Sequence, residues 1–197
     1  MRKGIIVFIL GALLNTGCSS DADEEEVPVH QKGAYVFAVI FENAAWSEQK
    51  KGLFIDGQGD LYTYDISNMG LDSVLHDETL TTQQMDGYFG VLPVLQESIA
   101  QQTFSTMWNA VPAIDAGSLG QQTAECADAG NYVYLAFDYT AQTDTYRPIL
   151  IYHTGDWRQE NLSAEATAVK DWLVELALNY SIAYELMPGE NNWCSGM

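Results

Sequence analysis

Three aspartates around a glycine-rich turn are the chain's candidates for binding a metal ion. Asp56 and Asp60 are the first and last residues of the segment DGQGD, and Asp65 follows it five residues later. Clustered carboxylate oxygens are ligands that Ca²⁺ prefers, but the EF-hand loop also needs Gly at its sixth position and Glu at its twelfth. Counted from Asp56, those positions hold Leu61 and Ser67. Glycines between two apolar segments are typical of a β-hairpin turn, so we expect a turn here and no cofactor.

A second group of residues has the chemistry of a hydrolase triad. Ser118 lies in the segment 116–120 (AGSLG), which is close to the G-x-S-x-G turn that exposes a nucleophilic serine. His153 and Asp156 would supply the base and the acid. However, Ala116 replaces the first glycine, and the residues before it lack the pattern of the strand that this turn requires. We therefore expect a non-catalytic domain, with an extracytoplasmic hydrolase that uses Ser118, His153 and Asp156 as the alternative.

The first eighteen residues have the organisation of an export leader. Two basic residues come first, residues 5–14 form an apolar segment, and small residues precede Cys18. The end of this leader resembles the lipobox of bacterial lipoproteins. The resemblance implies that residues 1–17 are a signal peptide that is removed and that Cys18 is acylated. It also implies a membrane-anchored protein of the cell envelope, and Ser19 is compatible with the outer membrane.

One position of the leader departs from the lipobox pattern. The family has an aliphatic residue three places before the cysteine, whereas here Asn15 stands there and Leu14 comes one place earlier. An ordinary secretory signal cut after Ala22 is the alternative. The apolar segment is too short to span a bilayer, so both interpretations predict an exported mature chain.

Residues 18–33 are predicted to be a flexible acidic tether. Five acidic residues fall between positions 21 and 26, and apolar side chains are scarce. Such a segment cannot bury enough surface to offset the entropy of ordering it, and its charges repel one another and extend it. Residues 34–197 have the length of a single domain with its own core.

The charge of the chain restricts its partners. The formal charge is −19, and loss of Arg2 and Lys3 with the leader leaves six basic residues against 27 acidic ones, or −21. This excess argues against nucleic acid and against docking on anionic lipid, because both are polyanions. Three interpretations remain: general solubility or salt adaptation, divalent cation binding, and attraction of a cationic protein or peptide. The membrane would then be reached through the lipid anchor.

The two cysteines outside the leader are predicted to form a disulfide. If Cys18 carries the lipid, Cys126 and Cys194 are an even pair in an oxidising compartment. Neither has the nearby histidine or the CxxC spacing that a metal pair or a nucleophile would need. The bond would close a loop of about 68 residues and hold the C-terminus.

The elements expected to position these residues form an α+β domain. We predict a mainly antiparallel sheet of about five strands, with a middle helical segment and a C-terminal helix packed on it. Tyrosines on the strands could form an open recognition face, but we expect the helices to cover it. The predicted strands are 35–41, 53–55, 61–66, 131–139 and 148–153, and the predicted helices are 82–92 (capped by Thr82), 94–106 and the segment that follows the N-cap Ser163.

Overall fold

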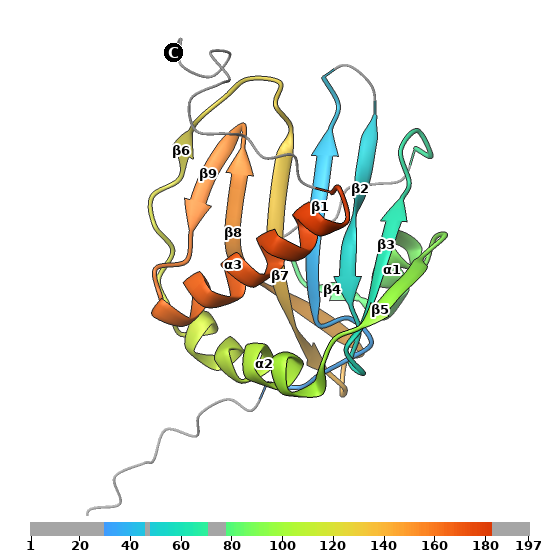
Figure 1. Cartoon of the computed structure of the whole chain (residues 1–197), viewed down its shortest axis with the longest axis vertical. Helices are drawn as coiled ribbons and strands as arrows, with labels where there is room; N and C mark the ends of the chain where they lie inside the picture. Colours follow the sequence, from blue (N-terminus) through green and yellow to red (C-terminus); the bar gives the residue numbers. More distant parts are fainter. Residues whose placement is uncertain (1–29, 46–47, 71–77, 183–197) are drawn as a thin grey trace, which may run out of the picture.

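A single antiparallel sheet forms the middle layer of the protein, and helices cover both of its faces (Figure 1). The computed structural model describes residues 30–45, 48–70 and 78–182. The strands are β1 (Phe37–Asn43), β2 (Gln49–Ile55), β3 (Asp60–Asp65), β4 (Leu80–Thr81), β5 (Val94–Ser98), β6 (Thr123–Ala124), β7 (Asn131–Thr140), β8 (Thr145–Gly155) and β9 (Trp157–Glu160). The helices are α1 (Thr82–Phe89), α2 (Gln101–Asp115) and α3 (Ala164–Asn179).

The strand order across the sheet is β5-β3-β2-β1-β7-β8-β9-β6, and β4 pairs with one end of β8. The α+β class and the antiparallel sheet are therefore confirmed. The expected number of about five strands was too low, since the described residues form nine. Three of the missed strands, β4, β6 and β9, contain two to four residues each. Segments of that length are too short to show the alternation by which a strand is recognised.

Strand β1 is the central element of the sheet, and both of its faces are buried as its continuous apolar sequence predicts. It pairs with β2 on one side and β7 on the other. Phe37, Val39 and Phe41 point into the core beneath α2 and α3, while Ala38 and Ile40 point into a second core beneath α1. The alternation of a strand sends successive side chains to opposite faces, so one apolar run supplies both cores.

Aromatic side chains dominate the core beneath α1. The ring of Phe89, on α1, lies within 5.4 Å, centroid to centroid, of the rings of Tyr35, Phe54 and Tyr64. Aromatic pairs at such distances add about 1 kcal/mol each beyond their burial. On the other face Tyr134 is buried among residues of the α2 and α3 core. Helices therefore cover the tyrosine-bearing faces, as expected from the sequence.

The middle helical segment differs from the prediction. Helix α1 ends at Phe89, and its N-cap is Thr81, one residue earlier than the expected Thr82; the Thr81 side chain and Gln84 form a capping box. Residues 94–98, which the sequence predicts to be helical, form strand β5. This segment pairs with β3 along its length, and such a tertiary contact overrides the weak helix preference of a five-residue segment. The C-terminal helix begins after Ser163 as predicted.

The last residues of the expected tether belong to the folded domain. The His30 ring lies between Asp115, with Nε2 at 3.5 Å from Oδ2, and Asp138, with Nδ1 at 3.1 Å from Oδ2. Arg147 donates to both aspartates, and the hydrogen bonds from Arg147 lower the pKa of Asp115. Lys32 places its Nζ 4.4 Å from the centre of the Phe104 ring. These partners lie far along the chain, so composition alone does not reveal them; residues 18–29 lie outside the described residues.

Candidate functional site

The three candidate metal ligands serve the β2–β3 hairpin. Asp56 Oδ1 accepts hydrogen bonds from two backbone amides of its own turn, at 2.9 Å each. Asp60 accepts one from the Ser98 hydroxyl, and Asp65 accepts one from the Ser67 amide at 3.0 Å. The predicted turn is confirmed. Within the described ranges no three or more His, Cys, Asp or Glu side chains are grouped so as to hold a metal ion.

His153 and Asp156 of the alternative triad each have a hydrogen-bond partner outside it, and Ser118 lies in a different local structure from the one predicted. His153 is buried, and its Nε2 lies 3.0 Å from Oδ1 of Asn131. Asp156 Oδ1 accepts a hydrogen bond from the Ala129 amide at 2.8 Å. Ser118 follows helix α2 rather than a strand, so the strand-to-helix turn that exposes a nucleophilic serine is not formed at this position.

The remaining predicted sites lie largely outside the described residues. Cys126 is buried, whereas Cys18 and Cys194 are not among the residues that the structure describes. Lipidation of Cys18 and the bond between Cys126 and Cys194 therefore stay predictions. In the part of the chain that the structure covers, no helix has the length and apolar character needed to cross a bilayer.

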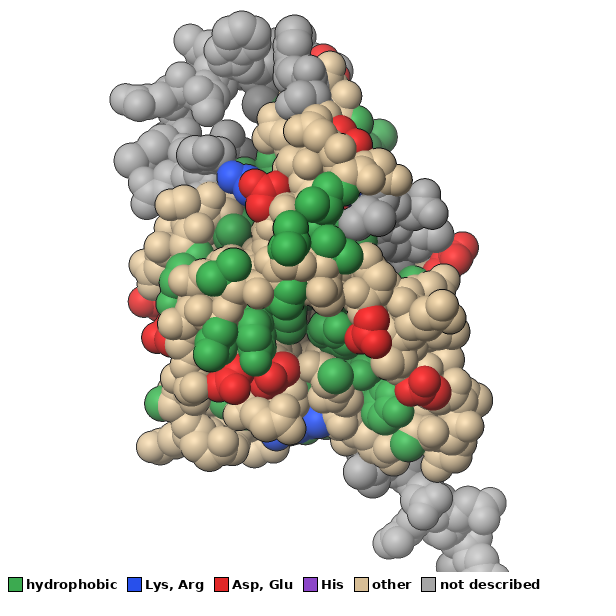
Figure 2. All heavy atoms as spheres, turned by 90° about the vertical axis from the view of Figure 1, so that its right-hand side faces the viewer, with side chains coloured by type: hydrophobic (Ala, Val, Ile, Leu, Met, Phe, Trp, Pro, Cys, Tyr) green, Lys and Arg blue, Asp and Glu red, His purple; other side chains and the backbone are tan. Residues whose placement is uncertain are grey.

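The most unusual surface of the molecule is strand β5, at one end of the sheet. All five of its residues are exposed, and among the described strands it pairs with β3 alone. Val94 and Leu95 are each 57% exposed, and Leu92, just before the strand, is 66% exposed. Figure 2 faces this side of the protein and shows hydrophobic side chains over its middle with separate acidic side chains around them. Proteins normally protect an open edge with charge, proline or a cover. Pro93 and Glu97 flank the pair Val94 and Leu95, but that pair itself is apolar and exposed. An exposed apolar pair on an open edge indicates a binding surface.

On the face of the sheet that α2 and α3 cover, β5 carries one apolar and one acidic side chain. Val94 lies opposite Thr63, and Glu97 lies opposite Leu61. The register shifts between these two pairs, and the side-chain amide of the intervening Gln96 donates to Thr63 Oγ1 at 2.8 Å. Opposed residues of an antiparallel pair point to the same face, so Val94 and Glu97 are both presented on this side of the edge.

The face of β5 on the α1 side repeats this arrangement. Leu95 lies opposite Tyr62, and Ser98 lies opposite Asp60, whose carboxylate accepts its hydroxyl hydrogen bond. Desolvation raises the pKa of Tyr62, and the nearby charges of Asp56 and Asp60 raise it further. Both faces of the edge therefore carry an apolar side chain toward the start of β5 and a carboxylate toward its end.

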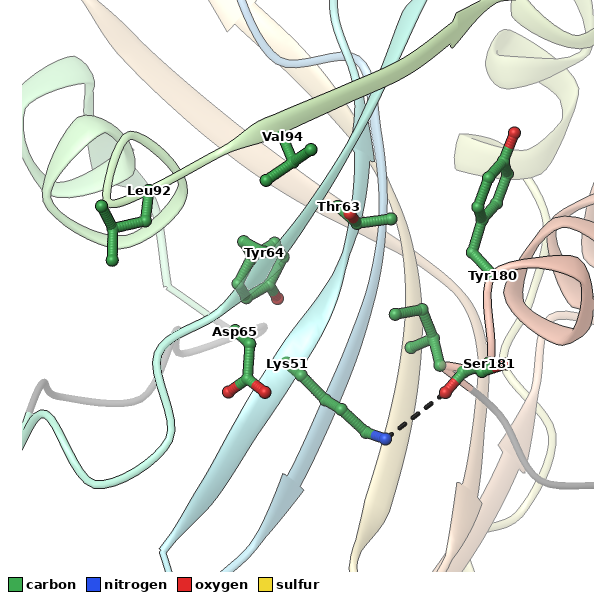
Figure 3. Close-up of a pocket in the computed structure, with 9 residues that line it drawn as sticks. Lys51, Thr63, Tyr64, Asp65, Leu92, Val94, Tyr180 and Ser181 are labelled. Carbon is green, nitrogen blue, oxygen red and sulfur yellow. Dashed lines mark hydrogen bonds between the residues drawn. The ribbon is translucent and has the colours of Figure 1, made fainter.

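A hollow of about 400 Å³ borders the edge on the α3 side (Figure 3). Lys51 and Asp65 lie at its floor, and the sides are formed by Val94 and by Tyr180 after α3. Lys51 Nζ donates to the Ser181 carbonyl at 3.4 Å, away from Asp65 in the figure. The Tyr180 hydroxyl donates to Glu97 Oε1 at 2.8 Å and ties the end of α3 to β5. The hollow therefore lies next to Val94, on the inner side of the edge strand.

Leu92 combines exposure with an unfavourable backbone conformation. Its φ angle is +53°, a left-handed conformation that costs an L-residue roughly 1–2 kcal/mol. An exposed leucine that is held in such a conformation beside an open edge contributes little to the fold. Strain of this kind is concentrated at functional sites, which supports a binding role for this part of the surface.

Replacing Leu92 with glycine is expected to raise the free energy of unfolding by about 1 kcal/mol, because glycine adopts positive φ without a steric penalty. Leu92→Ala, which keeps the penalty, should leave the stability near that of the parent. Chemical denaturation of the three proteins measures the difference. An equal gain in both variants would show that the backbone conformation is not the cause.

Sequence reasoning placed this surface in a helix and so missed it. The available signal was a pair of residues that favour turns. Gly90 and Pro93 flank a turn, and a proline just before a strand is compatible with an edge position. Comparison of the chain with protein-family models, curated proteins and solved structures found no match.

Proposed function

We propose that this protein is an exported, lipid-anchored binding protein of the cell envelope, and that the β5 edge binds another polypeptide without catalysing a reaction. The leader that ends at Cys18 supports export and anchoring in the cell envelope. One observation carries the binding role: β5 lies at the end of the sheet with all five residues exposed, and its first two residues, Val94 and Leu95, are apolar. The hydrogen bonds of His153 and Asp156 to other residues, and the position of Ser118 after a helix, favour this function over the hydrolase alternative.

The charge distribution supports a basic partner. Arg147 and Arg158 each pair with two acidic side chains, and Lys50 and Lys170 each pair with one. Lys32 lies over aromatic rings. The basic groups of the described residues are thus engaged, while the chain carries a large surplus of acids. That surplus attracts a cationic partner and should make its association fall with salt.

Position-specific cross-linking tests the proposed binding surface. A photoreactive residue at position 95 of the full lipoprotein, in its native envelope, should capture a discrete basic polypeptide, which mass spectrometry would identify. The matched control carries the same residue at position 162, because Leu162 is also an exposed leucine, at 64%, but lies before α3. Equal yields at both positions, or no polypeptide product at position 95, would contradict the proposal.

The substitution Leu95→Lys should weaken binding of the identified, purified partner about tenfold or more. It removes an exposed apolar contact and places on the edge a cation that repels a basic partner. Leu162→Lys should leave the affinity within about twofold of the parent, since it makes the same chemical change elsewhere. Fluorescence anisotropy at two salt concentrations would measure both variants.

A further inference from the structure

The arrangement of side chains on β5 indicates how a partner would lie on it. We propose that the edge accepts an extended segment of the partner as an added strand, in which two adjacent apolar residues face Val94 and Leu95 and two adjacent basic residues face Glu97 and Ser98. The inference rests on the proposed function, because it specifies the partner of the same surface.

The backbone of β5 provides the first part of this recognition. β5 lies at the end of the sheet, with β3 on its inner side. An edge strand offers N–H and C=O groups on its outer side, and an extended peptide can pair with them as an additional strand. Because successive residues of a strand point to opposite faces, the added segment would meet both faces of the edge at once.

The first half of β5 selects apolar residues. Val94 and Leu95 are neighbours in sequence and project to opposite faces, each with more than half of its surface exposed. An added strand would place one side chain beside each of them.

The second half of β5 selects basic residues. Glu97 projects to one face, and the carboxylate of Asp60 lies beside Ser98 on the other. Opposite charges on neighbouring strands stabilise their pairing, and like charges destabilise it. Glu97 uses Oε1 to accept from Tyr180, and its carboxylate charge remains next to the edge. A lysine or arginine on each face of the added strand therefore complements this half.

The charge of the chain disfavours a second copy of it as the occupant. The formal charge is −19 per chain, so two copies repel each other. The β5 sequence VLQES also contains no basic residue that could face Glu97 of another copy.

Synthetic peptides test the mode of binding on the full mature chain. The probes are acetyl-Thr-Lys-Lys-Val-Val-Thr-amide and the same peptide with its sequence reversed. They match the pairs Val94–Leu95 and Glu97–Ser98 in the antiparallel and parallel directions and leave no residue opposite the bulged Gln96. Binding should be saturable in fluorescence anisotropy at low salt. The antiparallel probe should bind more tightly, because antiparallel pairing is the more stable. Replacing both lysines of the probe with glutamate should abolish binding.

Two N-methylated versions of the tighter probe decide whether a strand is added. Each version carries N-methyl groups on alternate amides, so that one loses the donors of one edge and the other those of the opposite edge. We expect one version to lose about tenfold or more in affinity and the other to bind like the parent. In the protein, Glu97→Gln should lower the affinity about fivefold and flatten its salt dependence. Glu175→Gln makes the same chemical change at an exposed position of α3 and should leave both the affinity and its salt dependence unchanged.

The outcomes separate the inference from the proposed function. If both N-methylated peptides bind like the parent, or neither probe binds at millimolar concentration, strand addition is wrong. Loss of a dimer in Leu95→Lys, seen by sedimentation of the parent and the variant, would assign the edge to a second copy and also overturn the inference. The proposed function fails instead if cross-linking from position 95 yields no more partner than cross-linking from position 162.

Discussion

Replacing Gly155 with alanine is expected to destabilise the domain by more than about 3 kcal/mol, a large part of the 5–15 kcal/mol that stabilises a typical domain. Gly155 ends β8 with a φ angle of +118°, a conformation that residues with a Cβ rarely adopt. A Cβ at this position would lie 2.0 Å from the Gly130 carbonyl oxygen. That oxygen accepts a hydrogen bond from the Asp156 amide at 2.9 Å, so the backbone cannot move aside without losing a contact.

Gly87→Ala is the matched control for Gly155→Ala. Gly87 lies on the exposed side of α1, and no atom lies within 4 Å of a Cβ built there. Alanine is the better helix former by about 1 kcal/mol, so this variant should be slightly more stable than the parent. Urea denaturation followed by circular dichroism measures both variants. A Gly155→Ala protein within 1 kcal/mol of the parent would disprove the proposed steric cause.

Replacing Cys126 and Cys194 together with serine is expected to lower the free energy of unfolding by about 4 kcal/mol if the predicted bond is present. In the chain-entropy model a cross-link that closes a loop of this length stabilises by about that amount, because it restricts the unfolded chain. The melting temperature of the mature protein should fall by several degrees or more. Differential scanning calorimetry of the non-reduced parent and the double variant measures this change.

Thiol titration and the leader cysteine provide the controls for this prediction. The non-reduced mature protein should show no reactive thiol at Cys126 or Cys194, and two reactive thiols would show that the pairing is wrong. Cys18→Ser should remove the lipid without changing the melting temperature of the domain. Mass spectrometry of the membrane fraction reports the lipid, and an unmodified chain starting at Asp23 would indicate cleavage after Ala22 instead.

The sequence by itself determined the elements that depend only on residues close together in the chain. The apolar run around β1, the glycine turn between β2 and β3 and the Ser163 cap of α3 all appear where they were predicted. In each case, the signal is the periodicity of burial or a residue type that a turn or cap requires. Such signals need no knowledge of distant residues.

The tertiary structure alone decided which residues become the candidate site. The segment VLQES is a strand because β3 lies beside it, and it is an edge because no further described strand follows it in the sheet. In the same way, His30 belongs to the folded domain and not to the expected tether, because its ring contacts Asp115 and Asp138. Pairing between residues far apart in sequence fixes both results, and local preferences of under about 1 kcal/mol per residue are too weak to predict them. The open edge is therefore a property of the order of the strands, with which Pro93 is compatible but which it does not determine.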